Sequence, residues 1–145
     1  MNWRCVGLFT FNLIGMAAAA YLTYTHLFHL DPQCYGLGEC AFVQASPYAK
    51  MFGIPVALLG LIDYLVMLGT GGYAFLVKDK RRRMWALQIL VGLTFASWLY
   101  SAYLTYIEAF VLHGYCIYCL ISAFSITMMF LFSILEWRAF TNQAL

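Results

Sequence analysis

Two pairs of cysteines are the residues of this chain whose type and spacing could do chemistry. Cys116 and Cys119 form a Cys-x-x-Cys within "HGYCIYCLIS", and Cys34 and Cys40 bracket the stretch "CYGLGEC". A thiolate attacks a disulfide through a mixed-disulfide intermediate, so two neighbouring dithiols can pass electrons from one to the other. The same four thiols could instead bind a metal or form static cross-links, and the elements that carry them bear on this choice.

Three kinds of site compete for these four cysteines once haem is set aside. A c-type haem site requires His directly after the Cys-x-x-Cys, and Leu120 stands there. A four-thiolate zinc site stays possible, although Cys34 and Cys40 are spaced more widely than the usual pair of zinc ligands. Two structural disulfides or two redox-active dithiols are the other possibilities.

The placement of the Cys-x-x-Cys favours redox exchange among these possibilities. Cys116 is predicted at the N-terminal end of a helix, where unsatisfied backbone N–H groups and the helix dipole stabilise a thiolate and lower its pKa. Cys119 then lies one turn further in, about 4.5 Å deeper along the axis. Gly36 and Gly38 lie between the other two cysteines and favour a backbone that lets one thiol meet two partners in turn.

The composition requires membrane-spanning helices to carry these cysteines. Of the 145 residues, 64% are hydrophobic and only 10% are charged, whereas about 25% are charged in a typical soluble domain. A net charge of +2 is too small to suggest a nucleic-acid partner. In lipid, backbone groups must be satisfied within their own segment, so the spans are predicted to be helices. Four apolar segments exceed the ~20 residues that a crossing needs: 6–28, 54–77, 85–112 and 117–137.

We therefore expect an all-α integral membrane protein, a four-transmembrane-helix bundle that forms one domain over residues 1–145. The cysteines 34 and 40 fall in an outer loop over 29–53. If the N-terminus is cytoplasmic, the only basic residue outside is Lys50, and the inner ones are Arg4, Lys78, Lys80, Arg81, Arg82, Arg83 and Arg138. This asymmetry predicts that both termini are cytoplasmic.

One alternative concerns the first apolar segment, whose basic start and alanine run at 17–20 are also typical of a cleaved signal peptide. Apolar residues continue beyond the alanines as far as Phe28, which favours a full span. Within that span Gly15 and Ala19 have the small-xxx-small spacing that lets a neighbouring helix approach closely. Cys5 falls on the predicted cytoplasmic side, where we expect an inert, reduced thiol.

The order of these features resembles the vitamin K epoxide reductase family. The pair at 34 and 40 is followed by Ser46, then by "FGIP" at 52–55, which opens the second span, and then by the Cys-x-x-Cys that opens the last. The chain is similar in particular to bacterial homologues without a fused thioredoxin-like domain, which regenerate disulfides in the periplasm. Another bacterial quinone-linked disulfide generator carries its Cys-x-x-Cys in the first outer loop, whereas here it lies in the second.

The resemblance implies a role for each matching residue. Cys116 and Cys119 match the active-site pair, with Cys119 facing a quinone, while Cys34 and Cys40 match the pair that shuttles electrons from an external thiol protein. Ser46 matches a serine whose hydroxyl lies near a quinone carbonyl, where it could stabilise developing negative charge. Helix capping is the alternative for Ser46. Phe52 of the "FGIP" stretch is also expected at the quinone site.

The function implied is that of a quinone-dependent thiol–disulfide oxidoreductase in a bacterial inner membrane, with its active site facing the periplasm. Its partners would be the lipid bilayer, a soluble thioredoxin-fold thiol oxidase and a membrane quinone, either ubiquinone or menaquinone, with a vitamin K-type quinone possible. The animal vitamin K enzymes carry a tyrosine where this chain has Ala123, so vitamin K epoxide is a less favoured substrate. The alternatives are a vitamin K epoxide reductase proper and a non-catalytic membrane scaffold with structural disulfides or zinc.

Three titratable side chains outside the cysteine pairs are left with two interpretations each. Asp63 lies midway along the second span, where a carboxyl must be protonated or paired, and could be structural or functional. Glu108 and His113 lie near the outer end of the third span. They could shuttle protons, but solvation at the membrane interface is the favoured interpretation for both. A helical stripe is expected to pack on a neighbouring helix rather than to face a quinone: Tyr100, Tyr103, Ile107 and Phe110.

Overall fold

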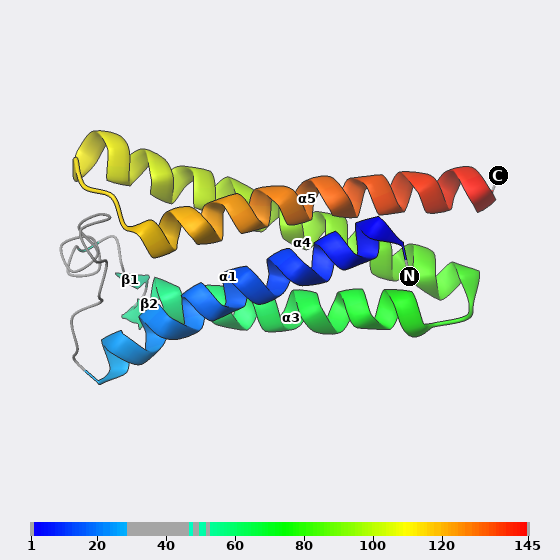
Figure 1. The fold of residues 1–145 in the computed structure, drawn as a ribbon, viewed down its shortest axis with the longest axis horizontal. Coiled ribbons are helices and arrows are strands. Elements are labelled where there is room, and N and C mark those ends of the chain that lie inside the picture. Colours follow the sequence, from blue (N-terminus) through cyan, green and yellow to red (C-terminus); the bar gives the residue numbers. More distant parts are fainter. Residues whose placement is uncertain (1, 29–46, 48–49, 52, 145) are drawn as a thin grey trace.

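Four long helices run side by side along the length of the molecule (Figure 1). The structure is a computed structural model and describes residues 2–28, 47, 50–51 and 53–144. Within these residues the helices are α1 (Trp3–Leu27), α3 (Val56–Leu76), α4 (Lys80–Tyr106) and α5 (Ile117–Ala144). All four are long and apolar enough to cross a membrane. The predicted fold class, an all-α bundle of four membrane-spanning helices, is confirmed.

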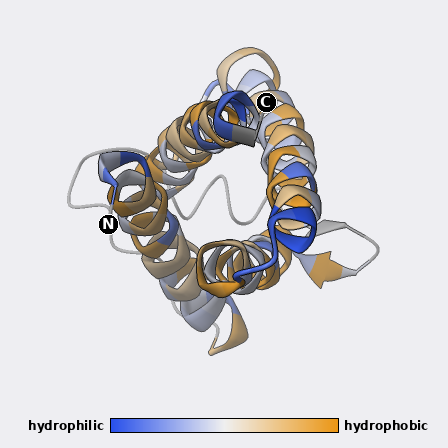
Figure 2. Ribbon diagram, turned by 90° about the vertical axis from the view of Figure 1, so that its right-hand side faces the viewer, coloured by the Kyte–Doolittle hydropathy of each residue, from blue (hydrophilic) through white to orange (hydrophobic). Residues whose placement is uncertain are grey.

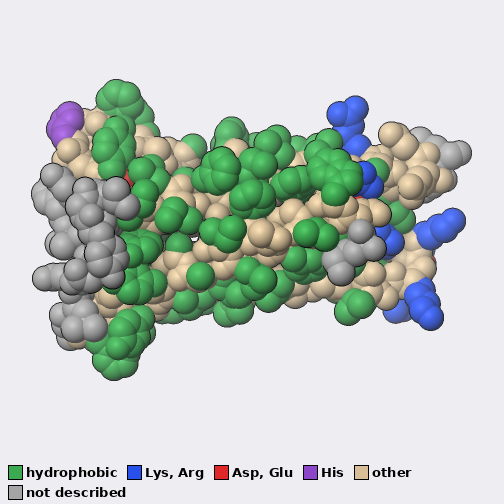
Figure 3. Space-filling view, in the orientation of Figure 1, with side chains coloured by type: hydrophobic (Ala, Val, Ile, Leu, Met, Phe, Trp, Pro, Cys, Tyr) green, Lys and Arg blue, Asp and Glu red, His purple; other side chains and the backbone are tan. Residues whose placement is uncertain are grey.

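The helices form a ring in the order α1, α3, α4 and α5, which is seen end-on in Figure 2. Both α1 and α4 pack on α3 and on α5. The buried core includes Leu8, Met67, Leu90 and Met129. Large apolar side chains also cover the outside of the bundle (Figure 3), and Leu76 is 83% exposed among them. Since burying apolar surface is favourable by about 25 cal/mol per Å², this outer surface suits lipid, as expected of an integral membrane protein.

The basic residues gather at the end of the bundle that carries both termini (Figures 1 and 3). At this end the carboxylate of Glu136, on α5, forms two ion pairs. Its Oε2 lies 2.8 Å from Arg4 Nε, and its Oε1 lies 3.3 Å from Arg83 Nη2. The Glu136 side chain is only 3% exposed. This ion cluster joins the beginnings of α1 and α4 to the last third of α5. It also offsets the unfavourable placement of a cation in the first turn of α4, where the helix dipole is positive.

A short β-hairpin precedes α3 at the opposite end of the molecule. Strands β1 (Lys50–Met51) and β2 (Ile54–Pro55) pair antiparallel, with Met51 opposite Ile54. Gly53 lies in the turn at φ 79°, a left-handed conformation that favours glycine. Because proline disfavours a helical conformation in the residue before it, α3 begins only after Pro55, although the apolar segment starts at Ile54. The hairpin therefore determines where the second span starts.

Candidate active site

The Cys-x-x-Cys opens α5, and its first cysteine forms the N-terminal boundary of that helix. The carbonyl of Cys116 accepts the first helical hydrogen bond, from Leu120 N at 3.0 Å. Cys116 is fully buried and packs near Leu22 of α1. One turn further in, Cys119 faces the interior of the bundle, and the two cysteine side chains hydrogen bond to each other. The structure thus places the two thiols together, as their spacing predicts.

The surroundings of Cys116 stabilise its thiolate. The hydrogen bond from the Cys119 side chain lowers the pKa of the Cys116 thiol to about 7, against burial, which raises it. The backbone N–H groups of Cys119 and Tyr118 act with the thiol of Cys119, while the carboxylate of Glu108 opposes them. The sequence pointed to the helix N-terminus as the cause, but the partner thiol is the larger one.

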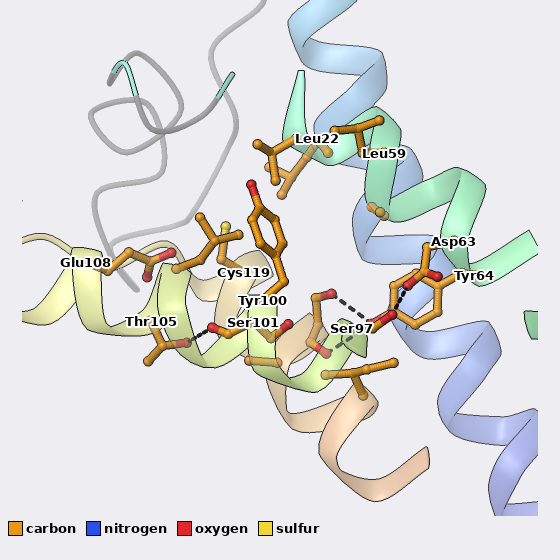
Figure 4. Close-up of a pocket in the computed structure, with 18 of the residues that line it drawn as sticks. Leu22, Leu59, Asp63, Tyr64, Ser97, Tyr100, Ser101, Thr105, Glu108 and Cys119 are labelled. Atoms are coloured by element: carbon orange, nitrogen blue, oxygen red, sulfur yellow. Dashed lines mark hydrogen bonds between the residues drawn. The ribbon is translucent and has the colours of Figure 1, made fainter. Parts of the chain in front are cut away.

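A cavity of about 380 Å³ lies between the four helices, with Cys119 in its wall (Figure 4). Side chains from α1, α3, α4 and α5 line it, so it belongs to the membrane-spanning part of the molecule. Most of its wall is apolar, with contributions from Leu22, Leu59, Leu104 and Ile126. A volume of this size is within the range of about 300–1,000 Å³ that is typical of small-molecule sites.

Polar groups lie at two places on this apolar wall (Figure 4). Glu108 lies beside Cys119 at the end near the start of α5. Towards the middle of the bundle, the Ser97 hydroxyl donates a hydrogen bond to the carboxyl of Asp63. Close to that pair, the Tyr64 hydroxyl lies 2.8 Å from Ser122 Oγ. The cavity therefore presents hydrogen-bonding groups at two separated points with an apolar wall between them.

Glu108 reaches the cysteines because α4 ends in a π-helical turn. This turn, η2, spans Ile107–Val111, and Leu112 N donates to Ile107 O at 2.9 Å. The chain then reverses at His113, whose φ of 53° is left-handed. Such widened turns change the direction in which a side chain points and are frequent at functional sites. Here Glu108 is 4% exposed, and Oε2 accepts a hydrogen bond from Cys116 N at 3.4 Å.

The structure corrects the prediction that Glu108 is solvated at the membrane interface. Its carboxyl is buried and hydrogen bonds to the side chain of Cys119. His113 is exposed, as the interface interpretation predicts. The two residues were grouped by their nearness in sequence, but the π-helical turn sends their side chains in different directions.

The predicted packing of the helical stripe along α4 and η2 is also wrong in part. Tyr100 lines the cavity, whereas it was expected to pack on a neighbouring helix. Tyr103 and Phe110 are exposed on the outside of the bundle. The sequence does carry a signal for the face that lines the cavity. Small hydroxyl residues on α4 and one carboxyl on η2 recur on the same side of this helical segment, and they are Ser97, Ser101, Thr105 and Glu108. Polar groups on one face of a membrane helix indicate a cavity or a partner.

Four of the predicted site residues lie outside the described residues, and their roles stay predictions: Cys34, Cys40, Ser46 and Phe52. Among the residues that the structure does describe, no three of His, Cys, Asp and Glu are grouped so as to hold a metal ion. With two of the four cysteines outside this set, the zinc alternative is not tested.

The sequence of the chain matches the model of a known protein family. The model of the vitamin K epoxide reductase family matches residues 7–134, which include the Cys-x-x-Cys and most of each helix. The chain belongs to this family. It is also 37% identical over 127 residues to the thiol-disulfide oxidoreductase LTO1 of Arabidopsis thaliana, which covers 82% of this chain. The chain spans about one third of the length of that relative, 33%.

Family membership gives a meaning to one departure noted in the sequence. Ala123, where the resemblance described above implies a tyrosine in the animal vitamin K enzymes, lies in the cavity wall. The missing phenol therefore changes the surface that a bound molecule would meet. Hydroxyl groups from Tyr100 and Tyr64 reach the same cavity from other helices.

Proposed function

We propose that this chain is a quinone-dependent thiol–disulfide oxidoreductase, which oxidises a soluble thiol protein and reduces a membrane quinone. In the balanced reaction, a dithiol protein and a quinone give a disulfide protein and a quinol. Two electrons and two protons pass from sulfur to oxygen. One observation carries the proposal: the inner thiol of the Cys-x-x-Cys, Cys119, lines an apolar cavity within the membrane-spanning bundle.

The residues around the cavity suit a quinone head group. A quinone is a flat, mostly apolar ring with two carbonyl oxygens on opposite edges, and when bound it supplies a lipid-soluble acceptor for two electrons. The apolar wall fits the ring. The hydroxyl of Tyr100, which also lines the cavity between the two polar places on its wall, could donate a hydrogen bond to one oxygen, while the Glu108 end lies near the other. Each such bond contributes about 0.5–1.5 kcal/mol.

The order of thiol exchange follows from the positions of the two sulfurs in α5. We propose that Cys40 exchanges with Cys116, which opens the helix, and that Cys119 is released as the thiol that faces the cavity. A thiol with a pKa near the ambient pH is well suited to such exchange, and the pKa of Cys116 is about 7. Cys34 would meet the soluble thiol protein, for which a thioredoxin fold is proposed. Ser46 and Phe52 are proposed at the quinone site.

A quinone acceptor also meets the energetic requirement of disulfide formation. A strongly oxidising thiol protein has a potential near about −120 mV, against about −180 mV for a thiol pool of the secretory type. That pool would have to work ~60 mV, about 2.8 kcal/mol, uphill to reoxidise it. A quinone, as a more oxidising acceptor, removes this barrier. We propose a bacterial inner membrane, with the basic end of the bundle in the cytoplasm and the Cys-x-x-Cys end in the periplasm.

The test is quinone reduction by the purified chain, with a reduced thioredoxin-fold protein as donor. Replacing the inner thiol, Cys119→Ser, should reduce quinol formation to the background rate. The matched control is Cys5→Ala. Cys5 is also a buried thiol, but it lies at the start of α1, whereas the Cys-x-x-Cys lies near Leu22 at the end of that helix. The Cys5→Ala variant should keep normal turnover. Normal turnover of Cys119→Ser would mean that the enzyme proposal is wrong and would favour a scaffold with static disulfides or zinc. Vitamin K epoxide, offered as a second acceptor, should be reduced more slowly than a quinone.

A further inference from the structure

Glu108 is a buried carboxyl in contact with the reacting sulfur, and the proposed exchange of electrons gives it no part. We propose that Glu108 is a catalytic residue that takes the thiol proton of Cys119 and passes it to the cavity, where the reduced acceptor needs it. This inference rests on the proposed function, because it requires Cys119 to give up its electrons to an acceptor in the cavity.

The contacts of Glu108 put its carboxyl between the dithiol and the cavity. Oε2 accepts a hydrogen bond from Cys116 N at 3.4 Å, and the carboxyl hydrogen bonds to the side chain of Cys119. Glu108, on η2, is itself part of the cavity wall and follows Thr105 and Ser101 of α4 along it (Figure 4). One carboxyl therefore touches the sulfur that loses a proton and the space in which a proton is consumed.

A structural role would require a different set of partners. Glu136, the other buried glutamate in the described part of the chain, is neutralised by two arginines, Arg4 and Arg83. No Lys, Arg or His side chain in the described part of the chain forms an ion pair with Glu108, although Glu108 is 4% exposed. An unpaired buried carboxylate is costly, so Glu108 gains from exchanging a proton with a neighbour. The neighbour that it touches is a thiol.

The proton balance of the reaction requires a group that accepts the proton of Cys119. When the Cys116–Cys119 disulfide forms, the two sulfurs release two electrons and two protons, and the acceptor takes up both. Cys116 titrates near neutral pH, with a pKa of about 7, so its proton can leave before the step. The proton of Cys119, which the Cys116 thiolate also attracts, must leave during the step, and Glu108 is the carboxylate in hydrogen-bond contact with the Cys119 side chain that can take it. Glu108 returns to its starting state when it gives this proton up.

Among the residues that the structure describes, few titratable groups surround Glu108, so the effect of Glu108 on the pH dependence of the reaction can be separated from theirs. From the start of α5, Cys116 and Cys119 face it. From α3, Asp63 and Tyr64 line the same cavity near its other end, and Tyr100 lies between on α4. From α1, the wall is formed by Ala19 and Leu22, which do not titrate.

Two substitutions separate proton transfer from simple positioning. Glu108→Gln keeps the length of the side chain and an oxygen that can accept from Cys116 N, but it cannot carry the proton. Glu108→Asp keeps the acid and shortens the reach. We expect Gln to lower kcat for quinol formation by about 10²-fold, in line with the loss of a general base, and Asp to retain more activity than Gln. If Gln equals or exceeds Asp, Glu108 only positions the dithiol and the inference is wrong.

A second readout does not depend on turnover. The Glu108 carboxylate raises the pKa of Cys116, so Glu108→Gln should shift the pH midpoint of Cys116 alkylation by iodoacetamide downwards in the reduced protein. A more reactive Cys116 together with slower quinol formation is the expected combination. Faster alkylation with unchanged or faster quinol formation would show Glu108 to be an electrostatic neighbour only. If the unmodified chain reduces no quinone, the proposed function fails. If the unmodified chain is active, Cys119→Ser is inactive and Glu108→Gln keeps full activity, only the inference about Glu108 fails.

Discussion

At the residue scale, the reactivity of the site depends on a few hydrogen bonds to Cys116. The thiol of Cys119 is the largest influence that lowers the pKa of Cys116. Below a pH of about 7 the Cys116 thiol is mostly protonated, and its thiolate fraction falls about tenfold for each further pH unit. The reactivity of Cys116 should therefore rise with pH and level off above pH 7, at a lower pH than for an ordinary cysteine.

Removing the hydrogen-bond donor should reverse this effect. In Cys119→Ala, the pH midpoint for alkylation of reduced Cys116 should move upwards towards the ordinary cysteine value, because the burial of Cys116 then acts with less opposition. Mass spectrometry of the alkylated protein over a pH series measures the midpoint, with Cys5→Ala as the background that removes the other buried thiol. A midpoint that stays at about 7 in Cys119→Ala would show that the N-terminus of α5 is sufficient by itself.

The sequence could predict the dithiol but not the carboxyl beside it. The spacing of Cys116 and Cys119 and the apolar run after them fix a pair of thiols at a helix start. The burial of Glu108 depends on the π-helical turn and on the left-handed His113, and hydrophobic periodicity does not reveal either. The pairing of Asp63 with Ser97 joins two helices, so it depends on how α3 and α4 are rotated against each other.

At the scale of the elements, one close approach fixes the rotation of α3. A Cβ added at Gly15 of α1 would collide with the ring of Tyr64. The same tyrosine hydrogen bonds to Ser122 of α5 at 2.8 Å, so one side chain connects three helices. Gly15 lies in the small-xxx-small pattern that predicted a close neighbour, and the structure identifies this neighbour as α3.

Gly15→Ala should therefore destabilise the bundle and disturb the cavity. We expect a loss of about 1–3 kcal/mol, as is usual when a packed site is overfilled, and a lower Tm in detergent. The control is Gly69→Ala on α3, where an added Cβ meets nothing within 4 Å. That variant should be neutral or slightly stabilising, since alanine favours a helix over glycine. Equal Tm values for the two variants would show that Tyr64 moves aside freely.

At the scale of the whole molecule, chemistry and anchoring lie at opposite ends of the same four helices. Cys116, Cys119 and Glu108 lie near the hairpin end, while the ion cluster around Glu136 lies at the basic end with both termini (Figure 1). The basic asymmetry could be read from the sequence, because seven of the eight Lys and Arg residues fall in segments that a bundle brings to one end. The sequence could not predict that Glu136 neutralises part of this charge, since Glu136 and its partner Arg4 are 132 residues apart in the chain.

This separation predicts that the ion cluster supports stability without taking part in the reaction. Glu136→Gln leaves Arg4 and Arg83 without a counter-charge near a buried site. Breaking a buried pair costs about 3–5 kcal/mol, and the partial exposure of both arginines places the expected loss at the lower end.

The matched control is Asp79→Asn, because Asp79 pairs with Arg82 at an exposed position and asparagine caps a helix as well as aspartate does. Its unfolding free energy should change by less than about 1 kcal/mol. Thermal unfolding in detergent measures both losses, and the pH midpoint for alkylation of Cys116 should stay unchanged in the folded Glu136→Gln protein. A shifted midpoint would show that the two ends of the bundle are coupled.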